Sequence, residues 1–238
     1  MLILALDSSA IVASVALCEN DRTVASFTVK NGNTHSETLL PMVESVLHCA
    51  QVEVNDVDLF ACSVGPGSFT GVRIGAATLK GLAFGKNKPC IGVSTLEALA
   101  QNLVPFEGLI CPVMNARRGQ VYNALFACEN GKLVRLCEDR ALSVADLEQE
   151  LQERALPFAL CGDGCAEYLR LAQKTVPAAI SPLLADQNAA SVAKVAYSAF
   201  LRGESGTDAA LAPVYLRLPQ AERERLAKIN AEKQGEKQ

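Results

Sequence analysis

The sequence predicts an α/β protein built from two similar units, each with three strands, a helix, a strand and a helix. Three observations indicate this fold. The strand and helix patterns occur twice in the same order, at an offset of about 100 residues. Half of the 238 residues are hydrophobic, which is enough to bury a substantial core. A glycine-rich turn in the first half joins an apolar strand to a helix. We expect units at residues 1–102 and 103–218, with the last helix free to pack back on the first unit.

The first unit is predicted from short β-prone runs that turn residues separate. Strands are expected at residues 2–6, 12–18, 23–29, 59–64 and 91–93. A helix is predicted after Thr34, because Thr34 and Glu37 form a capping-box pair ahead of an apolar helical pattern. Pro41 lies within this pattern and predicts a kink or a later start. Two further helices are expected, from Gly71 onward and from Thr95.

The second unit repeats this order. Strands are expected at residues 109–114, 121–128, 132–136 and 158–161, and helices at 165–173 and 188–202. Ser143 and Asp146 open a further helix that ends near Arg154. The last residues, 219–238, alternate Glu with Arg or Lys and have no apolar face, which predicts a solvated, flexible tail.

Composition excludes several classes of protein. The formal net charge of −4 argues against strong autonomous binding of nucleic acid, which needs a basic face. The nine cysteines are irregularly spaced and include no C-x-x-C pair, which is typical of reduced, buried thiols in a cytoplasmic protein. No uninterrupted apolar run reaches the ~18 residues of a membrane span. We therefore expect a cytoplasmic protein with no membrane contact.

The turn at residues 65–70 has the composition of an anion-binding site. Free amides and the positive end of a helix dipole follow the strand, and Ser68 and Thr70 supply hydroxyl groups. The spacing fits neither common nucleotide motif. Gly65, Gly67 and Gly71 give G-x-G-x-x-x-G rather than G-x-G-x-x-G, and no lysine follows the last glycine as in a Walker A loop.

The helix after this turn contains glycines that need an explanation. Gly75 and Gly81 each cost about 0.5–1 kcal/mol relative to Ala inside a helix. Gly71 and Gly75 form one row of small residues, and Ala77, Gly81 and Gly85 form another, so a second backbone can approach more than one face. Tight packing of the helix on its own sheet explains the same residues, and both interpretations stay open.

Five segments resemble the TsaB (YeaZ) family, over residues 1 to about 217. They are GPGSFTGVRIGAATLKGLAFG at 65–85, LILALDSSA at 2–10, HSETLLP at 35–41, MNARRGQVYNA at 114–124 and APVYLR at 212–217. The glycine motif is specific to this family and its catalytic paralogue, TsaD. The resemblance implies an RNase H-like, actin-like fold with a cleft between two subdomains. It also implies a non-catalytic scaffold that pairs with the threonylcarbamoyl transferase, which modifies tRNA next to the anticodon.

The resemblance also suggests which residues line the cleft. In the actin, Hsp70 and sugar-kinase superfamily, a carboxylate after the first strand meets a metal–phosphate complex, although an Asp there is also an ordinary turn former. The candidate nucleotide-binding or anion-binding residues are Asp7, Ser8, Ser9, Gly67, Ser68, Arg117 and Arg118. The family pattern commonly has acids where this chain has Asn115 and Gln120, which makes metal-assisted phosphoryl chemistry less plausible.

No metal site and no catalytic residue are predicted. The paralogue binds its metal through two histidines four residues apart on one helix, and alignment places Thr95 and Leu99 at these positions. Neither is a strong ligand. The two histidines of the chain, His35 and His48, lie near opposite ends of one helical segment and cannot share a metal.

The two helices that flank strand 59–64 form the partner surface implied by the resemblance. The residues expected there are Leu39, Leu40, Val43, Val46, Leu47, Val72, Gly75, Ala76, Leu79 and Leu82. The same surface would form a homodimer when the partner is absent. The family implies two further partners, the ATPase TsaE and tRNA bound through the complex. No tightly bound cofactor is expected, and ATP or ADP is the candidate nucleotide of the assembled complex. The alternatives are an ATPase or kinase of the same superfamily, and a peptidase that acts on the paralogue.

Overall fold

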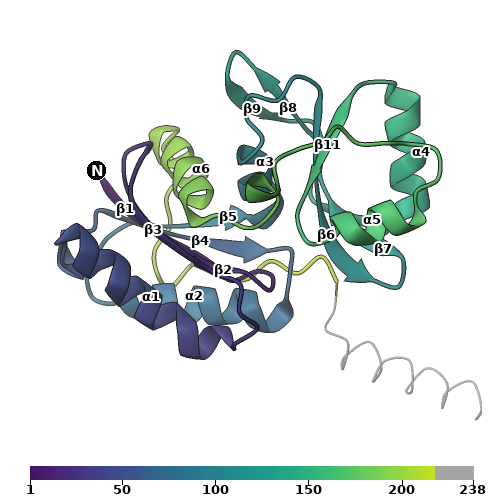
Figure 1. Cartoon of the computed structure of the whole chain (residues 1–238). Helices are drawn as coiled ribbons and strands as arrows, with labels where there is room; N and C mark the ends of the chain where they lie inside the picture. Colours follow the sequence, from purple (N-terminus) through teal and green to yellow (C-terminus); the bar gives the residue numbers. More distant parts are fainter. Residues whose placement is uncertain (218–238) are drawn as a thin grey trace, which may run out of the picture.

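The computed structural model describes residues 1–217, which form two α/β units side by side (Figure 1). The sheet of the first unit has the order β3-β2-β1-β4-β5. Its strands are β1 (Leu2–Asp7), β2 (Ala13–Glu19), β3 (Arg22–Val29), β4 (Leu59–Gly65) and β5 (Cys90–Ser94). β1 is antiparallel to β2 and parallel to β4. The tail predicted at 219–238 lies outside the described residues.

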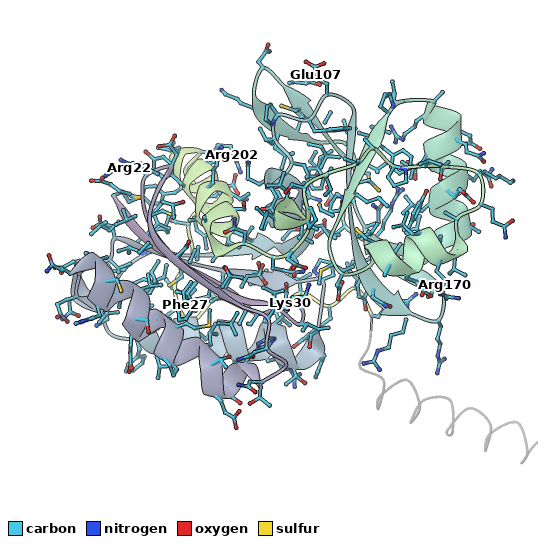
Figure 2. The ribbon with its side chains drawn as sticks, in the orientation of Figure 1. Arg22, Phe27, Lys30, Glu107, Arg170 and Arg202 are labelled. Carbon is cyan, nitrogen blue, oxygen red and sulfur yellow. The ribbon has the colours of Figure 1, made fainter. Side chains whose placement is uncertain are left out.

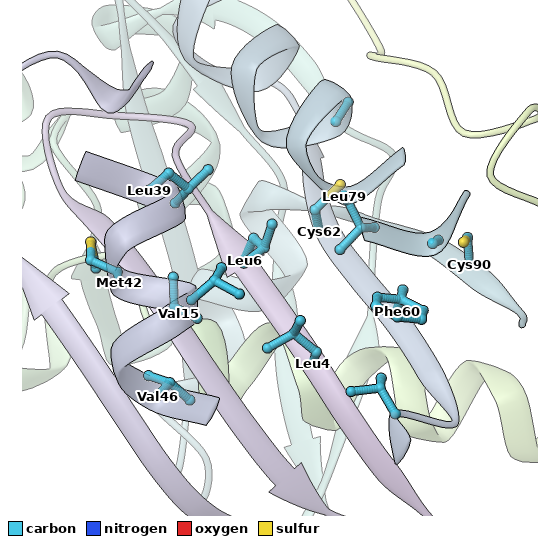
Figure 3. Packing of buried hydrophobic residues seen from close by; sticks show 14 of the residues in the cluster. Leu4, Leu6, Val15, Leu39, Met42, Val46, Phe60, Cys62, Leu79 and Cys90 are labelled. Carbon is cyan, nitrogen blue, oxygen red and sulfur yellow. The ribbon is translucent and has the colours of Figure 1, made fainter. Parts of the chain in front are cut away.

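Two helices, α1 (His35–Ala50) and α2 (Phe69–Ala83), cover one face of this sheet. Their inward side chains form one core cluster with the sheet, in which Leu6, Leu39, Phe60 and Leu79 are almost completely buried (Figure 3). A short 3₁₀ helix, η1 (Val54–Asp56), leads into β4, and α3 (Thr95–Gln101) follows β5 and reaches the second unit.

The second unit repeats the strand pairing of the first. Its strands are β6 (Leu109–Arg117), β7 (Gln120–Asn123), β8 (Phe126–Glu129), β9 (Lys132–Arg135), β10 (Arg140–Ser143) and β11 (Phe158–Cys161). β6 is antiparallel to β7 and β8 and parallel to β11. In the first unit, β1 is likewise antiparallel to β2 and parallel to β4. The helices α4 (Val144–Arg154) and α5 (Cys165–Leu171) cover this sheet. The predicted duplicated α/β fold is therefore confirmed.

The last helix, α6 (Ala189–Leu201), follows the 3₁₀ helix η2 (Pro182–Leu184) and returns to the first unit. Val192 and Ala196 pack with Ile3 and Ala61 on the sheet face opposite α1 and α2. The first sheet is thus covered on both faces, and the chain crosses between the units twice before its C-terminal segment. In residues 1–217, no helix is long and apolar enough to cross a membrane.

Several local predictions were wrong. The strand expected at 121–128 is divided into β7 and β8 after Asn123, and the buried Asn123 side-chain amide donates to the carbonyl groups of Pro112 and Ala124 at the break. The short strand β10 carried too weak a pattern to be predicted. Helix α1 passes through Pro41 without a break, and the Thr34 side chain does not cap it. Helix α2 begins at Phe69, two residues earlier than expected, because Ser68 caps it.

Candidate functional site: the glycine-rich turn and the cleft between the units

The glycine-rich turn lies directly against the turn between β1 and β2. The Ser68 side chain accepts a hydrogen bond from the backbone N–H of Gly71 (3.2 Å), and the Ser68 N–H donates to the carbonyl oxygen of Ser9 (2.7 Å). A Cβ atom at Gly67 would overlap the Ser9 carbonyl oxygen, and one at Gly71 would overlap the Ser8 carbonyl oxygen. Only glycine allows the two turns to approach this closely.

The two glycine rows of α2 have different surroundings. At Gly75 a Cβ atom would lie 2.5 Å from the Ser8 hydroxyl oxygen, so this row packs inside the chain. At Gly81 a Cβ atom would meet nothing within 4 Å. Of the two interpretations left open by the sequence, packing on the chain's own sheet therefore holds for Gly71 and Gly75, and an open outer face holds for Gly81.

Asp7 forms a closed hydrogen-bond network beneath the cleft. Its side chain is 1% exposed. Oδ1 accepts hydrogen bonds from the backbone N–H (2.9 Å) and hydroxyl (2.7 Å) of Ser9, and Oδ2 accepts one from the Ser63 hydroxyl (2.5 Å). Burial raises the pKa of Asp7, and these hydrogen bonds oppose the rise. Ser8 is also buried and donates to the carbonyl oxygen of Gly71 (2.9 Å). Both side chains are already used within the chain.

A cleft of about 510 Å³ lies between the units, within the size range of small-molecule sites. Ser9, Gly67, Ser68 and Arg117 line it, together with the N-terminal residues 69–70 of α2. The cleft thus collects four of the seven predicted anion-binding residues, with hydroxyl groups and a cation beside the positive end of a helix. Asp7, Ser8 and Arg118 are not part of its lining.

The second unit contributes an amide where an acid was expected. Asn115 is at the cleft, and its side-chain oxygen accepts a hydrogen bond from the Arg117 N–H (2.7 Å). Its backbone N–H donates to Asp163 Oδ1 (3.0 Å). Arg117 and Arg118 have φ angles of 63° and 56°, so the turn after β6 is left-handed.

Asp163 is the acidic residue that sequence reasoning missed. It follows β11, as Pro66 follows β4, and Gly162-Asp163-Gly164 occupies in the second unit the place of Gly65-Pro66-Gly67 in the first. The internal repeat could have indicated it. The carboxyl group is accessible, but the cleft walls partly desolvate it and thereby raise its pKa, while the Asn115 N–H lowers it.

Comparisons with known proteins identify the family. The chain matches the family model of TsaD, tRNA N6-adenosine threonylcarbamoyltransferase, over residues 29–224. It is 38% identical over 162 residues to the tRNA threonylcarbamoyladenosine biosynthesis protein TsaB of Bacillus subtilis (strain 168), over 68% of this chain and 71% of that protein. It is 31% identical over 225 residues to the TsaB protein of Haemophilus influenzae, over 90% and 93% of the two chains. The chain belongs to the TsaB family.

The solved structure of YeaZ from Pseudomonas aeruginosa shares the fold of this TsaB family chain. The two superpose with a TM-score of 0.77 at 31% sequence identity, over 90% of this chain and 99% of that one. A second structure from the same organism, described as an uncharacterized protein with similarity to peptidase YEAZ, gives a TM-score of 0.79 at 31% identity, over 91% and 99%. The resemblance noted from the sequence motifs is confirmed.

The residues at the paralogue's metal positions are part of the core in this TsaB family chain. Thr95 and Leu99 are both almost completely buried in α3. His35 Nε2 donates to the carbonyl oxygen of Ala10 (2.6 Å), and His48 lies in the last turn of α1. Residues 1–217 contain no group of three or more His, Cys, Asp or Glu side chains able to hold a metal ion.

Most of the residues predicted for the partner surface are buried in the core instead. This applies to Leu39, Val43, Val46, Val72, Gly75, Ala76 and Leu79. The correction has a simple cause: an apolar stripe at helical spacing is what the helix needs to cover its own sheet. Of the predicted set, Leu40 is 47% exposed, and Leu47 and Leu82 are partly buried. The outer face of α1 and α2 is therefore made of other residues than the stripe.

Proposed function

We propose that this chain acts in the biosynthesis of threonylcarbamoyladenosine on tRNA, as a non-catalytic scaffold that pairs with the paralogous transferase. Membership of the TsaB family supports the pathway, because the TsaB relatives are named as biosynthesis proteins for tRNA threonylcarbamoyladenosine. The observation that carries the scaffold role is the outer face of α2, where Gly81 opens directly to solvent although glycine weakens a helix.

We define the outer helix face as the apolar and small residues of α1, of α2 and at the position after α2 that are at least partly exposed. It consists of Leu40, Leu47, Ile74, Ala77, Thr78, Gly81, Leu82 and Phe84, of which Leu47, Ile74 and Leu82 also pack against the core. Phe84 is 78% exposed. Exposed apolar side chains together with the small residues Ala77 and Gly81 would allow a second pair of helices to pack closely against this face.

The transferase paralogue is the occupant that the comparisons favour. Because the chain matches the TsaD family model over most of its length, we expect the paralogue to have an equivalent sheet with equivalent helices. Two such helix layers can pack on each other, and a second copy of this chain could occupy the same face when the paralogue is absent. Homodimerisation and pairing with the paralogue would then compete.

The site chemistry is consistent with a role other than catalysis. Asp7 is buried and accepts three hydrogen bonds, and the equivalent position near the end of β6 carries the neutral Asn115. These features disfavour the ATPase or kinase alternative. For a peptidase, burial raises the pKa of the Cys62 and Cys111 thiols, which keeps both protonated and poor nucleophiles.

The remaining partners are proposed at the level of the complex. The cleft offers hydroxyl groups and Arg117 to a small anion, and ATP or ADP is the candidate nucleotide once the complex has assembled. Contact with tRNA is shared with the partner, because the net charge of this chain is −4. TsaE would join the assembled pair, and the compartment we propose is the cytoplasm.

Replacement of Gly81 by Leu tests the interface. The new side chain enters open space in the isolated chain, so the fold should be retained or slightly stabilised. Overpacking an interface costs about 1–3 kcal/mol, so binding to the transferase should weaken by about one to two orders of magnitude. Ala166→Leu, another small-to-large change at an exposed helical position, is the matched control in α5. Sedimentation velocity and melting curves measure both effects.

Two outcomes would contradict the proposal at different levels. If Gly81→Leu folds and pairs with wild-type affinity, the outer helix face is not the contact surface. If depletion of this protein leaves the threonylcarbamoyladenosine content of tRNA unchanged, as measured by nucleoside mass spectrometry, the pathway assignment is wrong.

A further inference from the structure

The C-terminal segment at residues 212–217 runs between the two units at the cleft. We call these residues the clasp. The residue before it, Leu211, is 5% exposed and belongs to the core of the first unit. The Val214 N–H donates to the carbonyl oxygen of Val64 at the end of β4 (2.7 Å). A Cβ atom at Gly65 would overlap the Val214 carbonyl oxygen, so glycine at 65 is required for the clasp to lie this close.

An aromatic and cationic cluster attaches the clasp to α2. The Tyr215 ring lies 4.7 Å from the Phe69 ring, centroid to centroid. Arg73 Nε donates to the Tyr215 hydroxyl oxygen (2.7 Å), and the Arg73 guanidinium lies 3.8 Å from the Phe69 ring centroid. One arginine therefore binds both aromatic residues, through a hydrogen bond and a cation–π contact.

The other end of the clasp is bound to the second unit. Arg217 Nη1 donates to the carbonyl oxygen of Ala116 in β6 (3.1 Å). The Arg217 guanidinium also lies 5.8 Å from the centroid of the Tyr122 ring in β7. Six consecutive residues thus contact the first strand pair of one unit and the glycine-rich turn of the other, and residues 214–217 form one wall of the cleft.

We propose that the clasp locks the two units together and sets the width of the cleft. The chain crosses between the units near residues 102–108 and again before α6, and two crossings alone leave a hinge. The clasp adds a third connection at the cleft itself. Opening the cleft beyond its present size requires the clasp to release either its first-unit contacts, made by Val214 and Tyr215, or the second-unit contacts of Arg217. A ligand larger than the cleft must therefore detach the clasp from one unit.

Two truncations test the lock. A chain that ends at Leu211 loses the clasp and everything after it, whereas a chain that ends at Arg217 keeps the clasp and is the matched control. Hydrogen–deuterium exchange reports opening at residues 65–70 and 114–119. Loss of the clasp's hydrogen bonds with Val64, Arg73 and Ala116 should speed exchange there by about tenfold or more in the shorter chain, and the longer chain should match the full chain. Equal exchange in all three chains would overturn the proposal.

Point variants keep the test decisive if the shorter chain does not fold. Arg217→Ala removes only the contacts with the second unit, and it should speed exchange at residues 114–119 severalfold without changing exchange in α1. Arg202→Ala is the control, because Arg202 lies at the surface just after α6 (Figure 2) and pairs there with the exposed Glu204. If Arg217→Ala exchanges like Arg202→Ala, the clasp does not hold the units together.

Binding of a fluorescent ATP analogue gives a second readout. The shorter chain and Arg217→Ala should each bind the analogue with an affinity that differs from that of the full chain, because one wall of the cleft has been released. An affinity that is the same in every variant, together with unchanged exchange, would show that the clasp only rests on the surface.

Discussion

The same substitution at two positions of α2, Gly71→Ala and Gly81→Ala, should have opposite effects on stability. Both residues are helical, so replacement by Ala gains about 0.5–1 kcal/mol of helix propensity at each. At Gly81 nothing opposes this gain, because the new Cβ atom meets no other atom within 4 Å. At Gly71 the Cβ atom would overlap the Ser8 carbonyl oxygen and lie 3.2 Å from the Ser8 carbonyl carbon.

The clash at Gly71 cannot be relieved by a side-chain rotation, because the opposing atoms are backbone. Overpacking of this kind costs about 1–3 kcal/mol, which exceeds the helix gain. Because the helix gain is the same at both positions, the two variants should differ by the overpacking cost of about 1–3 kcal/mol in the free energy of unfolding. This corresponds to roughly 2–12 °C in melting temperature for a chain of this size.

Thermal unfolding followed by circular dichroism, with both variants in one buffer, measures the difference. Gly81→Ala should melt at or above the wild-type temperature and Gly71→Ala clearly below it. Denaturant titration gives the free energies independently. If both variants shift in the same direction by similar amounts, the close approach of α2 to the β1–β2 turn does not control its stability, and the distinction between the two glycine rows is wrong.

Three further predictions concern titratable groups. Glu148 Oε1 accepts hydrogen bonds from the N–H groups of residues 173–175, and the Lys174 N–H is the main cause of the lowered pKa of Glu148. Wild-type stability should therefore fall as the pH drops through that pKa. Glu148→Gln should lose this pH dependence, and urea titrations at pH 7 should show a loss of about 1–3 kcal/mol in the free energy of unfolding. Burial raises the pKa of Asp7, so the contribution of Asp7 to stability is present below its unfolded-state pKa and is lost as the pH rises through its folded-state pKa. The difference in stability between wild type and Asp7→Asn should therefore change between these two pKa values. A difference that does not vary with pH would contradict the raised pKa. In thiol-labelling experiments on the native chain, the exposed Cys49 should react first and Cys62 only after unfolding; early labelling of Cys62 would show that the core opens.

The strand and helix order was predictable because it depends on local patterns. The apolar run of β4 ends at a glycine and a proline, and the hydrophobic spacing of α1 has the period of a helix. The two-unit architecture followed from repetition of that order. By contrast, the break after Asn123 coincides with a buried amide that donates to the Pro112 carbonyl of the neighbouring strand and to the Ala124 carbonyl beside it, which no local pattern records.

The cleft was only partly predictable for a similar reason. Ser9, Ser68 and Arg117 lie on turns whose positions follow from the strand order, and the structure brings them together. Burial of Asp7 depends on Ser63 in another strand, and the position of Asp163 depends on the pairing of β11 with β6. These are contacts between distant parts of the chain.

The partner surface shows a different limit. Leu39, Val43 and Val46 attract attention because they are large and regularly spaced, but the sheet beneath them requires that spacing. A helix that packs on its own sheet through one face and on a partner through another shows a strong apolar pattern only for the face on the sheet. The weaker pattern of small residues, such as Ala77 and Gly81, was the more informative one for the outer face.

The inward glycines have a consequence for how the chain could distinguish its partners. Because the backbone of α2 already lies as close to Ser8 and Ser9 as its atoms allow, the helix cannot sink further toward the sheet to adapt to a different surface. The height of α2 above the sheet is therefore constant, whichever protein binds. If the chain pairs through this face as proposed, a preference for the paralogue over a second copy of this chain must be encoded in the exposed side chains, Leu40 and Phe84 among them. Exchange of those side chains alone should then be enough to redirect pairing.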